Sequence, residues 1–418
     1  MDLRPSARQQ ELMDRARDLA VTRFAGRAAQ TDRDATFPFE DFDDLRHAGF
    51  LGLCVPETLG GLGADFETYC LVSSEIAKGN GSTALCFNMH CLTMLMMGEL
   101  SEAIEMTAEQ RIAHRARTRK KFLEVIEQGV FYGQPHSEPV EEGETDASLP
   151  HGGRRFGTSA EKTDGGYVIN GRKFFVSLSD AADYFSTPCI LNNSDAPWID
   201  RTLYLQVPRN AAGVTFSGDW DPIGMRGTVS RNMILEDVFV SDDAEILPSG
   251  GFGRFFQAHA HGPLTFTATF LGLMQQAYEL AVKFLAGTEP GAPSKGETGP
   301  VLGQALAELQ FTVEATQALY WRSISEAKLP PTTEIRQRAR AAHVTVQRNA
   351  VAVTQEAMRI CGGRALLKQY PFERYARDAH AASVMRPWTQ EAVIADSWRS
   401  ILAAAKRVKA TEDQEAVT

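Results

Sequence analysis

The sequence predicts an α+β fold in which helical segments flank a central run of short strands. Helical periodicity dominates residues 1–127, strand-like runs recur over residues 128–243, and long helical patterns return over residues 244–418. This order predicts an N-terminal helical domain, a middle antiparallel β domain and a C-terminal four-helix bundle. With 418 residues, 43% of them hydrophobic, the chain is long enough to bury a large core.

Composition and charge exclude several classes of protein. The net charge is −10 and the densest basic stretches, Arg117–Lys121 and Lys406–Lys409, are short, so we expect no nucleic-acid partner. The six cysteines include no Cys-x-x-Cys pair and no metal-ligating spacing with histidine, which predicts reduced thiols, no metal site and a cytoplasmic location. The most apolar helical stretch, Thr93–Leu100, is too short to span a bilayer, so we expect no membrane association.

The N-terminal third carries several helical patterns. Apolar residues recur at helical spacing in Arg8–Arg27 and again in Tyr69–Lys78. Between these helices, Leu53–Gly63 is a glycine-rich stretch that predicts a connector. Ser82 is placed to cap a further helix that continues to Met97.

The middle segment predicts an antiparallel sheet or barrel, because its strand-like runs are short and Gly, Asn, Asp and Pro clusters separate them. The runs are Val130–Gly133, Tyr167–Ile169, Lys173–Ser177, Tyr184–Leu191, Thr202–Val207, Val214–Phe216 and Met233–Val240. The C-terminal segment predicts an up-down bundle of four long helices. These are Phe252–Ala286, Leu302–Ala327, Thr333–Ile360 and Thr389–Ala410.

Several motifs then follow one another in a recognisable order. Cys361–Gly363 ends a long helical pattern in a glycine pair, and Tyr370–His380 carries Pro-x-Glu-Arg and Arg-Asp. Upstream, His136–Pro139 reads His-Ser-Glu-Pro, Asn170–Ser177 reads Asn-Gly-x-Lys-x-Phe-Val-Ser, and Ile223–Thr228 contains Gly-x-Arg-x-Thr. Together these motifs resemble those of the acyl-CoA dehydrogenase superfamily, and the resemblance covers essentially the whole chain. It implies the same three-part fold that the periodicity predicts.

The resemblance implies a flavin cofactor. In the superfamily the glycine pair lies along the adenosine end of FAD, so Gly362 and Gly363 are expected there. Phe175 stands in place of a tryptophan that stacks on the flavin, Ser177 in place of a threonine that hydrogen-bonds it, and Ser137 at a strand end that meets the ring. We expect FAD, with FMN as the alternative. The expected cofactor-binding residues are Ser137, Phe175, Val176, Ser177, Gly362, Gly363, Thr389 and Glu391.

Two departures from the superfamily pattern predict weak FAD binding. Val140–Asp146 is longer and more acidic than the matching loop, and carboxylates disfavour contact with a pyrophosphate. Thr288–Gly291 stands where the superfamily carries an arginine that reaches the FAD of a neighbouring subunit. The resemblance also implies assembly as a homodimer or homotetramer through the last bundle.

The carboxylate base of the superfamily has no counterpart in this chain. An acyl-CoA dehydrogenase removes an α-proton with a glutamate while the β-hydride goes to the flavin, and here that position falls on Arg386 or Pro387. An arginine stays protonated, so Arg386 is expected to hold an anionic group or to polarise a carbonyl. A minority of the superfamily carries the base at the place that matches Gly262–Pro263. The adjacent His261 titrates near neutrality and is therefore the candidate base.

Three hypotheses follow for the function. The first is dehydrogenation of an acyl-CoA or acyl-carrier-protein thioester with His261 as base and an electron-transfer partner as acceptor. The second is a flavin-dependent monooxygenase that uses oxygen, because Arg377–Ala381 reproduces the Arg-Asp-x-His-Ala run of such relatives. The third is a base-less partner subunit of a hetero-oligomeric dehydrogenase. We place the dehydrogenase first because that activity dominates the superfamily.

Overall fold

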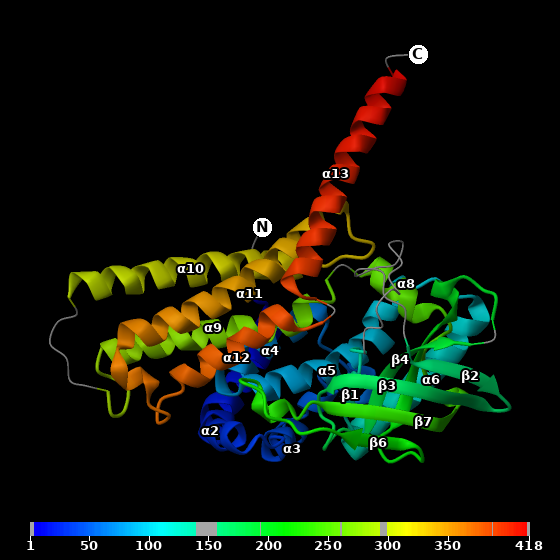
Figure 1. The fold of residues 1–418 in the computed structure, drawn as a ribbon, viewed down its shortest axis with the longest axis horizontal. Coiled ribbons are helices and arrows are strands. Elements are labelled where there is room, and N and C mark those ends of the chain that lie inside the picture. Colours follow the sequence, from blue (N-terminus) through cyan, green and yellow to red (C-terminus); the bar gives the residue numbers. More distant parts are fainter. Residues whose placement is uncertain are drawn as a thin grey trace.

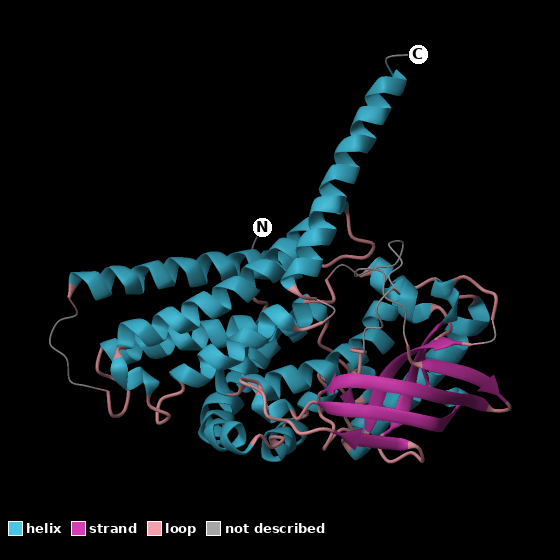
Figure 2. Cartoon of the chain, in the orientation of Figure 1, coloured by secondary structure: helices cyan, strands magenta, loops and turns pink. Residues whose placement is uncertain are grey.

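The strands gather at one end of the molecule together with α6 and α8, and most of the other helices lie at the opposite end (Figure 1). Figures 1 and 2 show the N- and C-terminal helices packed beside one another, the strands gathered at one end, and α13 projecting from the body. The predicted α+β fold, with N-terminal helices, a middle sheet and C-terminal helices, is confirmed. The computed structural model describes residues 4–138, 157–192, 194–259, 261–292, 299–386 and 388–415.

Side-chain caps define where the N-terminal helices begin. The Ser6 hydroxyl accepts the backbone N–H of Gln9, and the Gln9 side chain accepts the backbone N–H of Ser6, which forms a capping box. Asn80, and not the predicted Ser82, caps α5, because the Asn80 side chain accepts the N–H groups of Ser82 and Thr83. The helices are α1 (Ala7–Leu19), a π-helical turn (Ala20–Phe24), α2 (Ala25–Asp34), α3 (Phe39–His47), α4 (Phe66–Gly79), α5 (Gly81–Met97) and α6 (Ala108–Gln128).

The middle sheet follows the strand order β6-β7-β3-β2-β4-β5-β8, with β1 paired to β4. Most pairings are antiparallel as predicted, but β1 and β2 each pair with β4 in parallel. Two predicted strands are joined in β3, because a register shift between Ile169 and Gly171 interrupts the alternation without ending the strand. The prediction missed β2, which is mostly exposed, and β8, which is only 3 residues long. The strands are β1 (Tyr132–Gly133), β2 (Ser159–Thr163), β3 (Gly166–Val176), β4 (Tyr184–Leu191), β5 (Thr202–Pro208), β6 (Val214–Ser217), β7 (Arg231–Ser241) and β8 (Glu245–Leu247).

The C-terminal helices differ from the predicted bundle at two points. The pattern over Phe252–Ala286 is two helices, because Pro263 lacks an amide proton and disfavours a helical conformation at Gly262. In Figure 1, α13 leaves the bundle, and α12 packs against α9 and α11 through its buried face, which includes Phe372 and Tyr375. The helices are α8 (Gly251–Ala258), α9 (Leu264–Leu285), α10 (Pro300–Ser325), α11 (Thr333–Cys361), α12 (Phe372–Val384) and α13 (Gln390–Glu415).

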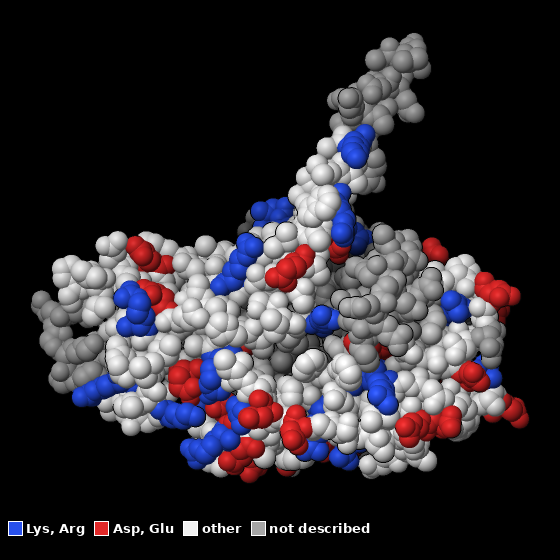
Figure 3. Space-filling model, in the orientation of Figure 1, with Lys and Arg blue, Asp and Glu red and all other residues white. Residues whose placement is uncertain are grey.

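The three parts share one core. Buried helix α4 packs along α9, which joins the N-terminal helices to the C-terminal bundle, while α6 contacts β8 and α8 contacts β5. On the face shown in Figure 3, acidic and basic side chains are interspersed. No helix in the described part of the chain is long and apolar enough to cross a membrane. Short 3-10 helices lie at Phe50–Gly52, Glu57–Leu59, Glu99–Ala103, Trp198–Arg201, Arg226–Thr228, Asp242–Ala244 and Gly363–Leu366.

Candidate functional site

The end of β3 presents an aromatic ring to solvent. Phe175 is 70% exposed and has a φ of 52°, a left-handed conformation that costs a bulky residue roughly 1–3 kcal/mol. The pairing of β3 with β7 shifts register between Lys173 and Val176, so Phe175 lies in a bulge. Val176 is fully buried and anchors the strand from the other side. An exposed aromatic ring held in a strained bulge is typical of a binding site.

Ser137 lies beside this bulge. Its backbone carbonyl accepts a hydrogen bond of 2.8 Å from the N–H of Phe174. The neighbouring Glu138 forms an ion pair with Lys173, whose buried ammonium also donates to the carbonyl of Pro188 at 2.6 Å. These buried contacts hold the strand segment that carries Ser137 against the end of β3.

A chain of hydroxyl groups runs inward from Ser177. Its Oγ lies 2.9 Å from Ser230 Oγ, which lies 2.8 Å from Thr228 Oγ1. Thr228 in turn donates to the backbone carbonyl of Met225 at 2.9 Å. Thr228 and Ser230 are buried, whereas Ser177 is half-buried. The sequence alone does not connect Thr228 and Ser230 with Ser177, because the three hydroxyls meet only when the segment before β7 packs beside the end of β3.

Met225 connects the hydroxyl chain to α12. It has a left-handed φ of 52°, and its N–H donates to Asp378 Oδ1 at 2.5 Å. Burial raises the pKa of the Asp378 carboxyl to about 6. At Gly224, an added Cβ would lie 2.4 Å from the carbonyl oxygen of Arg377, so this loop packs directly on α12. The loop that precedes β7 is therefore positioned by a C-terminal helix.

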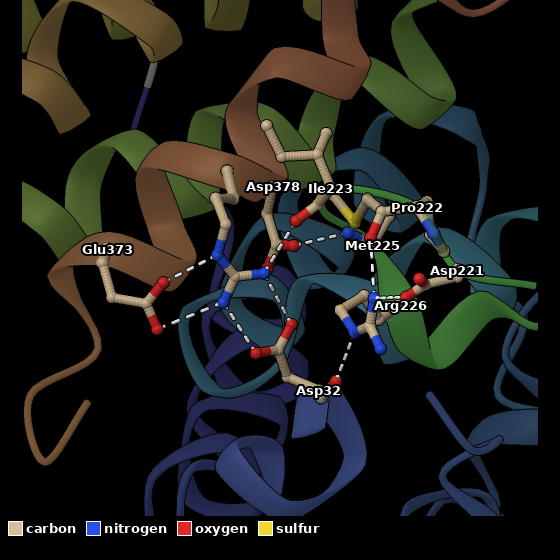
Figure 4. A network of polar contacts seen from close by, with 9 residues as sticks. Asp32, Asp221, Pro222, Ile223, Met225, Arg226, Glu373 and Asp378 are labelled. Carbon is tan, nitrogen blue, oxygen red and sulfur yellow. Dashed lines mark hydrogen bonds and ion pairs between the residues drawn. The ribbon is translucent and has the colours of Figure 1, made fainter. Parts of the chain in front are cut away.

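Figure 4 shows the polar network that continues from this loop along α12. The guanidinium of Arg377 donates to Asp32 at 2.9 and 2.7 Å, to Glu373 at 2.6 and 3.1 Å, and to the carbonyl of Ile223 at 2.8 Å. These bonds use all five N–H donors of an arginine. The hydrogen bonds that Arg377 donates to the Asp32 carboxylate raise the pKa of Arg377 above its ordinary value. Because the acceptors lie on α2, on α12 and before β7, one side chain joins all three parts of the chain.

The predicted glycine pair forms an open surface at the end of α11. Gly362 caps α11 with a φ of 78°, and both Gly362 and Gly363 are exposed. Within the described ranges, no heavy atom other than those of neighbouring residues lies within 4 Å of a Cβ added at either position. Two turns earlier, Gln355 Nε2 lies 3.1 Å from His380 Nε2, which links α11 to α12. The backbone of the glycine pair is therefore accessible to a ligand.

Thr389 and Glu391 lie at the start of α13. The Thr389 hydroxyl accepts the N–H of Ala392 at 3.4 Å, so Thr389 has a capping role, and Glu391 is exposed. Ser137 and Phe175–Ser177 form one group at the edge of the sheet. Across the residues that the structure describes, no hydrogen bond or ion pair links that group to Thr389 or Glu391.

His261 is buried, and neither ring nitrogen has a hydrogen-bond partner among the described residues. Phe66 meets the His261 ring edge-on, with the ring centroids 6.1 Å apart. Burial, assisted by the charge of Arg336, lowers the pKa of His261 to about 4. The imidazole is therefore neutral near pH 7 and is a weaker base than an ordinary imidazole. His259 differs, because its Nε2 lies 2.8 Å from the carbonyl oxygen of Leu100.

Arg386 is exposed in the segment that follows α12. His343 of α11 fixes this segment, because its Nε2 donates to the carbonyl of Trp388 at 3.0 Å while its Nδ1 lies 2.7 Å from Thr267 Oγ1 on α9. His343 thereby ties the segment that carries Arg386 to the first turn of α9, the helix that His261 precedes. No hydrogen bond or ion pair between described residues joins Arg386 to His261.

Parts of the predicted site fall outside the described residues, namely Val140–Asp146 and Pro387. Thr288, where the superfamily carries an arginine, is exposed, and its hydroxyl donates to the carbonyl of Lys283 at 3.2 Å. In the part of the chain that is described, no cluster of three or more His, Cys, Asp or Glu side chains is suited to hold a metal ion.

Three models of one protein family match the chain. They describe the N-terminal domain of acyl-CoA dehydrogenases over residues 6–111, the middle domain over residues 152–238 and the C-terminal domain over residues 264–386. The chain belongs to the acyl-CoA dehydrogenase superfamily. The resemblance found in the sequence motifs is thereby confirmed, and membership makes the protein an oxidoreductase.

Proteins similar to this chain carry different activities in their names. The human mitochondrial short-chain specific acyl-CoA dehydrogenase is 26% identical over 383 residues, which cover 90% of this chain and 85% of the relative. L-evernosamine nitrososynthase of Micromonospora sp. is 27% identical over 391 residues, which cover 88% and 85% of the two chains. The FMN-bound structure of the dibenzothiophene monooxygenase TdsC from Paenibacillus sp. A11-2 superposes with a TM-score of 0.78 at 21% identity. That likeness covers 94% of this chain and 98% of TdsC, and it shows a shared fold.

Proposed function

We propose that this superfamily member dehydrogenates an acyl thioester between its α and β carbons, with a flavin as hydride acceptor and a base other than the usual glutamate. The match of the superfamily models across all three parts of the chain carries the proposal. A relative with 26% identity is named an acyl-CoA dehydrogenase. The substrate is an acyl-CoA or acyl-carrier-protein thioester, and an electron-transfer partner receives the electrons.

The residues at the β3 bulge fit a flavin. Phe175 offers an open aromatic face, and Ser177 offers an oxygen atom beside it. The open backbone of Gly362 and Gly363 suits the adenosine end of a dinucleotide, which favours FAD over FMN. When bound, the flavin supplies the acceptor for the hydride that leaves the substrate β-carbon. The further proposed contacts are Ser137, Val176, Thr389 and Glu391.

We assign the role of base to His261. The imidazole is neutral near pH 7, and neither ring nitrogen has a hydrogen-bond partner among the described residues, which leaves an acceptor for the substrate α-proton. Arg386 cannot serve as a base because a guanidinium stays protonated. Exposed after α12, Arg386 instead holds an anionic group of the substrate or polarises the thioester carbonyl.

A second candidate function is that of a flavin-dependent monooxygenase with oxygen as co-substrate. The run Arg377–Ala381 favours it, because the structure leaves His380 of this run exposed beside Gln355. A relative with 27% identity is named a nitrososynthase, which also favours oxygen chemistry in this branch of the superfamily. A base-less partner subunit of a hetero-oligomeric dehydrogenase is the third candidate.

We infer that the protein self-associates through α13. Four apolar side chains of this helix are exposed, with fractions of 39% for Ile394, 52% for Trp398, 57% for Ile401 and 52% for Leu402. Their helical spacing places them on one face. Figure 1 shows α13 projecting away from the body, so a second copy of the same helix is the partner that buries this face on both chains. The assembly is a homodimer, or a homotetramer if the dimers pair.

Product analysis tests the proposed function. Protein reconstituted with FAD is incubated without oxygen with a panel of acyl-CoAs and an artificial electron acceptor, and the thioesters are analysed by mass spectrometry. A product that has lost a pair of hydrogen atoms supports dehydrogenation. A product that has gained an oxygen atom only when reduced flavin and oxygen are supplied replaces it with monooxygenation. A protein that binds little flavin and forms neither product would support the hypothesis of a base-less partner subunit.

A further inference from the structure

A cavity opens between α6 and the sheet. Its volume is about 230 Å³, below the roughly 300–1,000 Å³ of pockets that take drug-sized ligands. At this end of the molecule α6 packs on β8 (Figure 1). Ser241 in the cavity wall pairs with Gly166 at the start of β3, whereas Phe175 lies near the end of that strand. The cavity is therefore separate from the candidate flavin site and has room only for a small ligand.

A buried ammonium lines this cavity. Lys121 of α6 is 4% exposed, and its Nζ donates to Gln206 Oε1 and to the backbone carbonyl of Asp243, each at 2.6 Å. Gln206 is held in turn, because its Nε2 donates to the Tyr132 hydroxyl at 3.0 Å. An ammonium has three N–H donors, so one remains for the cavity. Both acceptors of Lys121 are neutral oxygens.

The charge of Lys121 is only partly compensated by its surroundings, and burial lowers the pKa of its ammonium to about 8. Among the charged groups that face it, Lys120 pairs with Asp243 at 3.4 Å, and Arg117 pairs with an acidic side chain of β8. Glu124 is half-buried, and among the described residues no hydrogen bond joins it to Lys121. Buried charges in proteins are normally paired, so an anion in the cavity would complete the contacts of this ammonium.

Aromatic rings form another part of the cavity wall. Phe239 on β7 is 53% exposed, and Tyr184 on β4 is half-buried. An aromatic ligand can stack on rings of this kind. Burial raises the pKa of Tyr184, so its hydroxyl stays neutral near pH 8. The cavity thus combines one buried cation with open aromatic surface.

We propose that the cavity between α6 and the sheet binds a small aromatic carboxylate, with the carboxylate on Lys121 and the ring against Phe239 and Tyr184. A charge-assisted hydrogen bond from the ammonium to a carboxylate is stronger than one to a neutral oxygen. The bond requires the protonated form of Lys121. Affinity should therefore be constant below about pH 7 and fall roughly tenfold per pH unit above about pH 8.

Calorimetry of the full chain with benzoate tests the proposal, and benzamide is the neutral comparison. At pH 7 the wild type should bind benzoate at least about tenfold more tightly than benzamide. Lys121→Met should weaken benzoate binding about 10- to 100-fold and remove its pH dependence. Lys120→Met is the matched control, because it removes a 64% exposed ammonium that lines the same cavity, and it should change the affinity less than about fivefold. Phe239→Ala keeps Lys121 and should weaken benzoate about 2- to 10-fold.

Benzoate binding that weakens above about pH 8 and is lost in Lys121→Met but kept in Lys120→Met supports the inference. Equal affinity of the wild type for benzoate and benzamide overturns it, and so does an affinity unchanged in Lys121→Met. Equal losses in Lys120→Met and Lys121→Met overturn the role of the buried ammonium. If Lys121→Met does not fold, the pH profile of the wild type and Phe239→Ala decide, and an affinity unchanged in Phe239→Ala overturns the inference. Absence of saturable benzoate binding overturns it as well and leaves the proposed flavin site unaffected.

Discussion

Substituting Arg377 tests whether one side chain joins the three parts of the chain. Arg377→Ala removes all five N–H donors, and Arg377→Lys keeps the charge but offers three donors without the planar arrangement. Arg359→Ala is the matched control, because Arg359 is 61% exposed and pairs with Glu356 on its own helix. The comparison separates the loss of the contacts that Arg377 makes to the three parts of the chain from the general effect of losing an arginine near the end of the bundle.

The expected magnitudes follow from burial. The side chains of Arg377 and Asp32 are 21% and 12% exposed, so truncation leaves a largely desolvated carboxylate without its partner. Breaking a buried ion pair costs about 3–5 kcal/mol, and because this pair retains some solvent contact we expect a loss of about 3 kcal/mol in the free energy of unfolding for Arg377→Ala. Exposed ion pairs contribute under about 1 kcal/mol, so we expect Arg359→Ala to lower the free energy of unfolding by less than about 1 kcal/mol. Arg377→Lys should fall between the two.

Chemical denaturation combined with hydrogen exchange measures this prediction. In Arg377→Ala, amide exchange should accelerate together in α2, in the loop before β7 and in α12, because all three supply acceptors to the same guanidinium. A double-mutant cycle with Asp32→Ala should show coupling of at least about 1 kcal/mol. Faster exchange confined to α12, or a loss of stability no larger than in Arg359→Ala, would refute the reasoning.

Further predictions concern the cofactor, the base and the assembly. Phe175→Ala should weaken flavin binding about tenfold in calorimetry, because the stacking of the two rings is lost. Phe239→Ala, at a 53% exposed position on β7, should leave flavin binding unchanged. Equal effects of the two substitutions would argue against placing the flavin ring on Phe175. His261→Asn should slow flavin reduction by roughly 10²–10⁴-fold. In the wild type, the rate of flavin reduction should stay constant from neutral pH down to about pH 4, where His261 gains its proton. A midpoint near 6.5 in this pH profile would contradict the claim that burial lowers the pKa of His261. Because the unfolded chain binds that proton at about 6.5, stability should fall as the pH drops from 6.5 toward 4. Trp398→Glu should shift the mass measured by light scattering toward that of the monomer, and Arg399→Ala should leave the mass unchanged. An unchanged mass in both variants rules out α13 as the interface.

Much of the fold is accessible from sequence because periodicity reports burial directly. The long helices α10 and α11 and the strands β4 and β7 carry clear apolar patterns, and they lie close to where the patterns place them. Elements fixed by tertiary contact are harder to predict. The pattern of α12 is short, yet its buried face lets it pack on α9 and α11, whereas the long pattern of α13 leaves Trp398 and Ile401 exposed.

Only part of the candidate site can likewise be predicted from the sequence. Motif spacing identified Phe175 and Ser177 as neighbours on one strand, but the bulge that exposes Phe175 arises from a register shift against β7, which no local pattern contains. Ser230 meets Ser177, and Thr228 meets Ser230, only because β7 pairs with β3. The sequence indicates His261 only by its place beside Gly262–Pro263, and only packing shows that its ring nitrogens are buried without partners among the described residues.

Anaerobic reduction of the bound flavin by a substrate tests the central claim most directly. FAD-reconstituted wild-type protein and His261→Asn are mixed without oxygen with a panel of acyl-CoAs of increasing chain length, and flavin absorbance is followed by stopped flow. Rapid bleaching of the wild type by at least one acyl-CoA, slowed by roughly 10²–10⁴-fold in His261→Asn, is the predicted result. Wild-type flavin that stays oxidised with every thioester contradicts dehydrogenation, and bleaching at equal rates in both proteins contradicts His261 as its base.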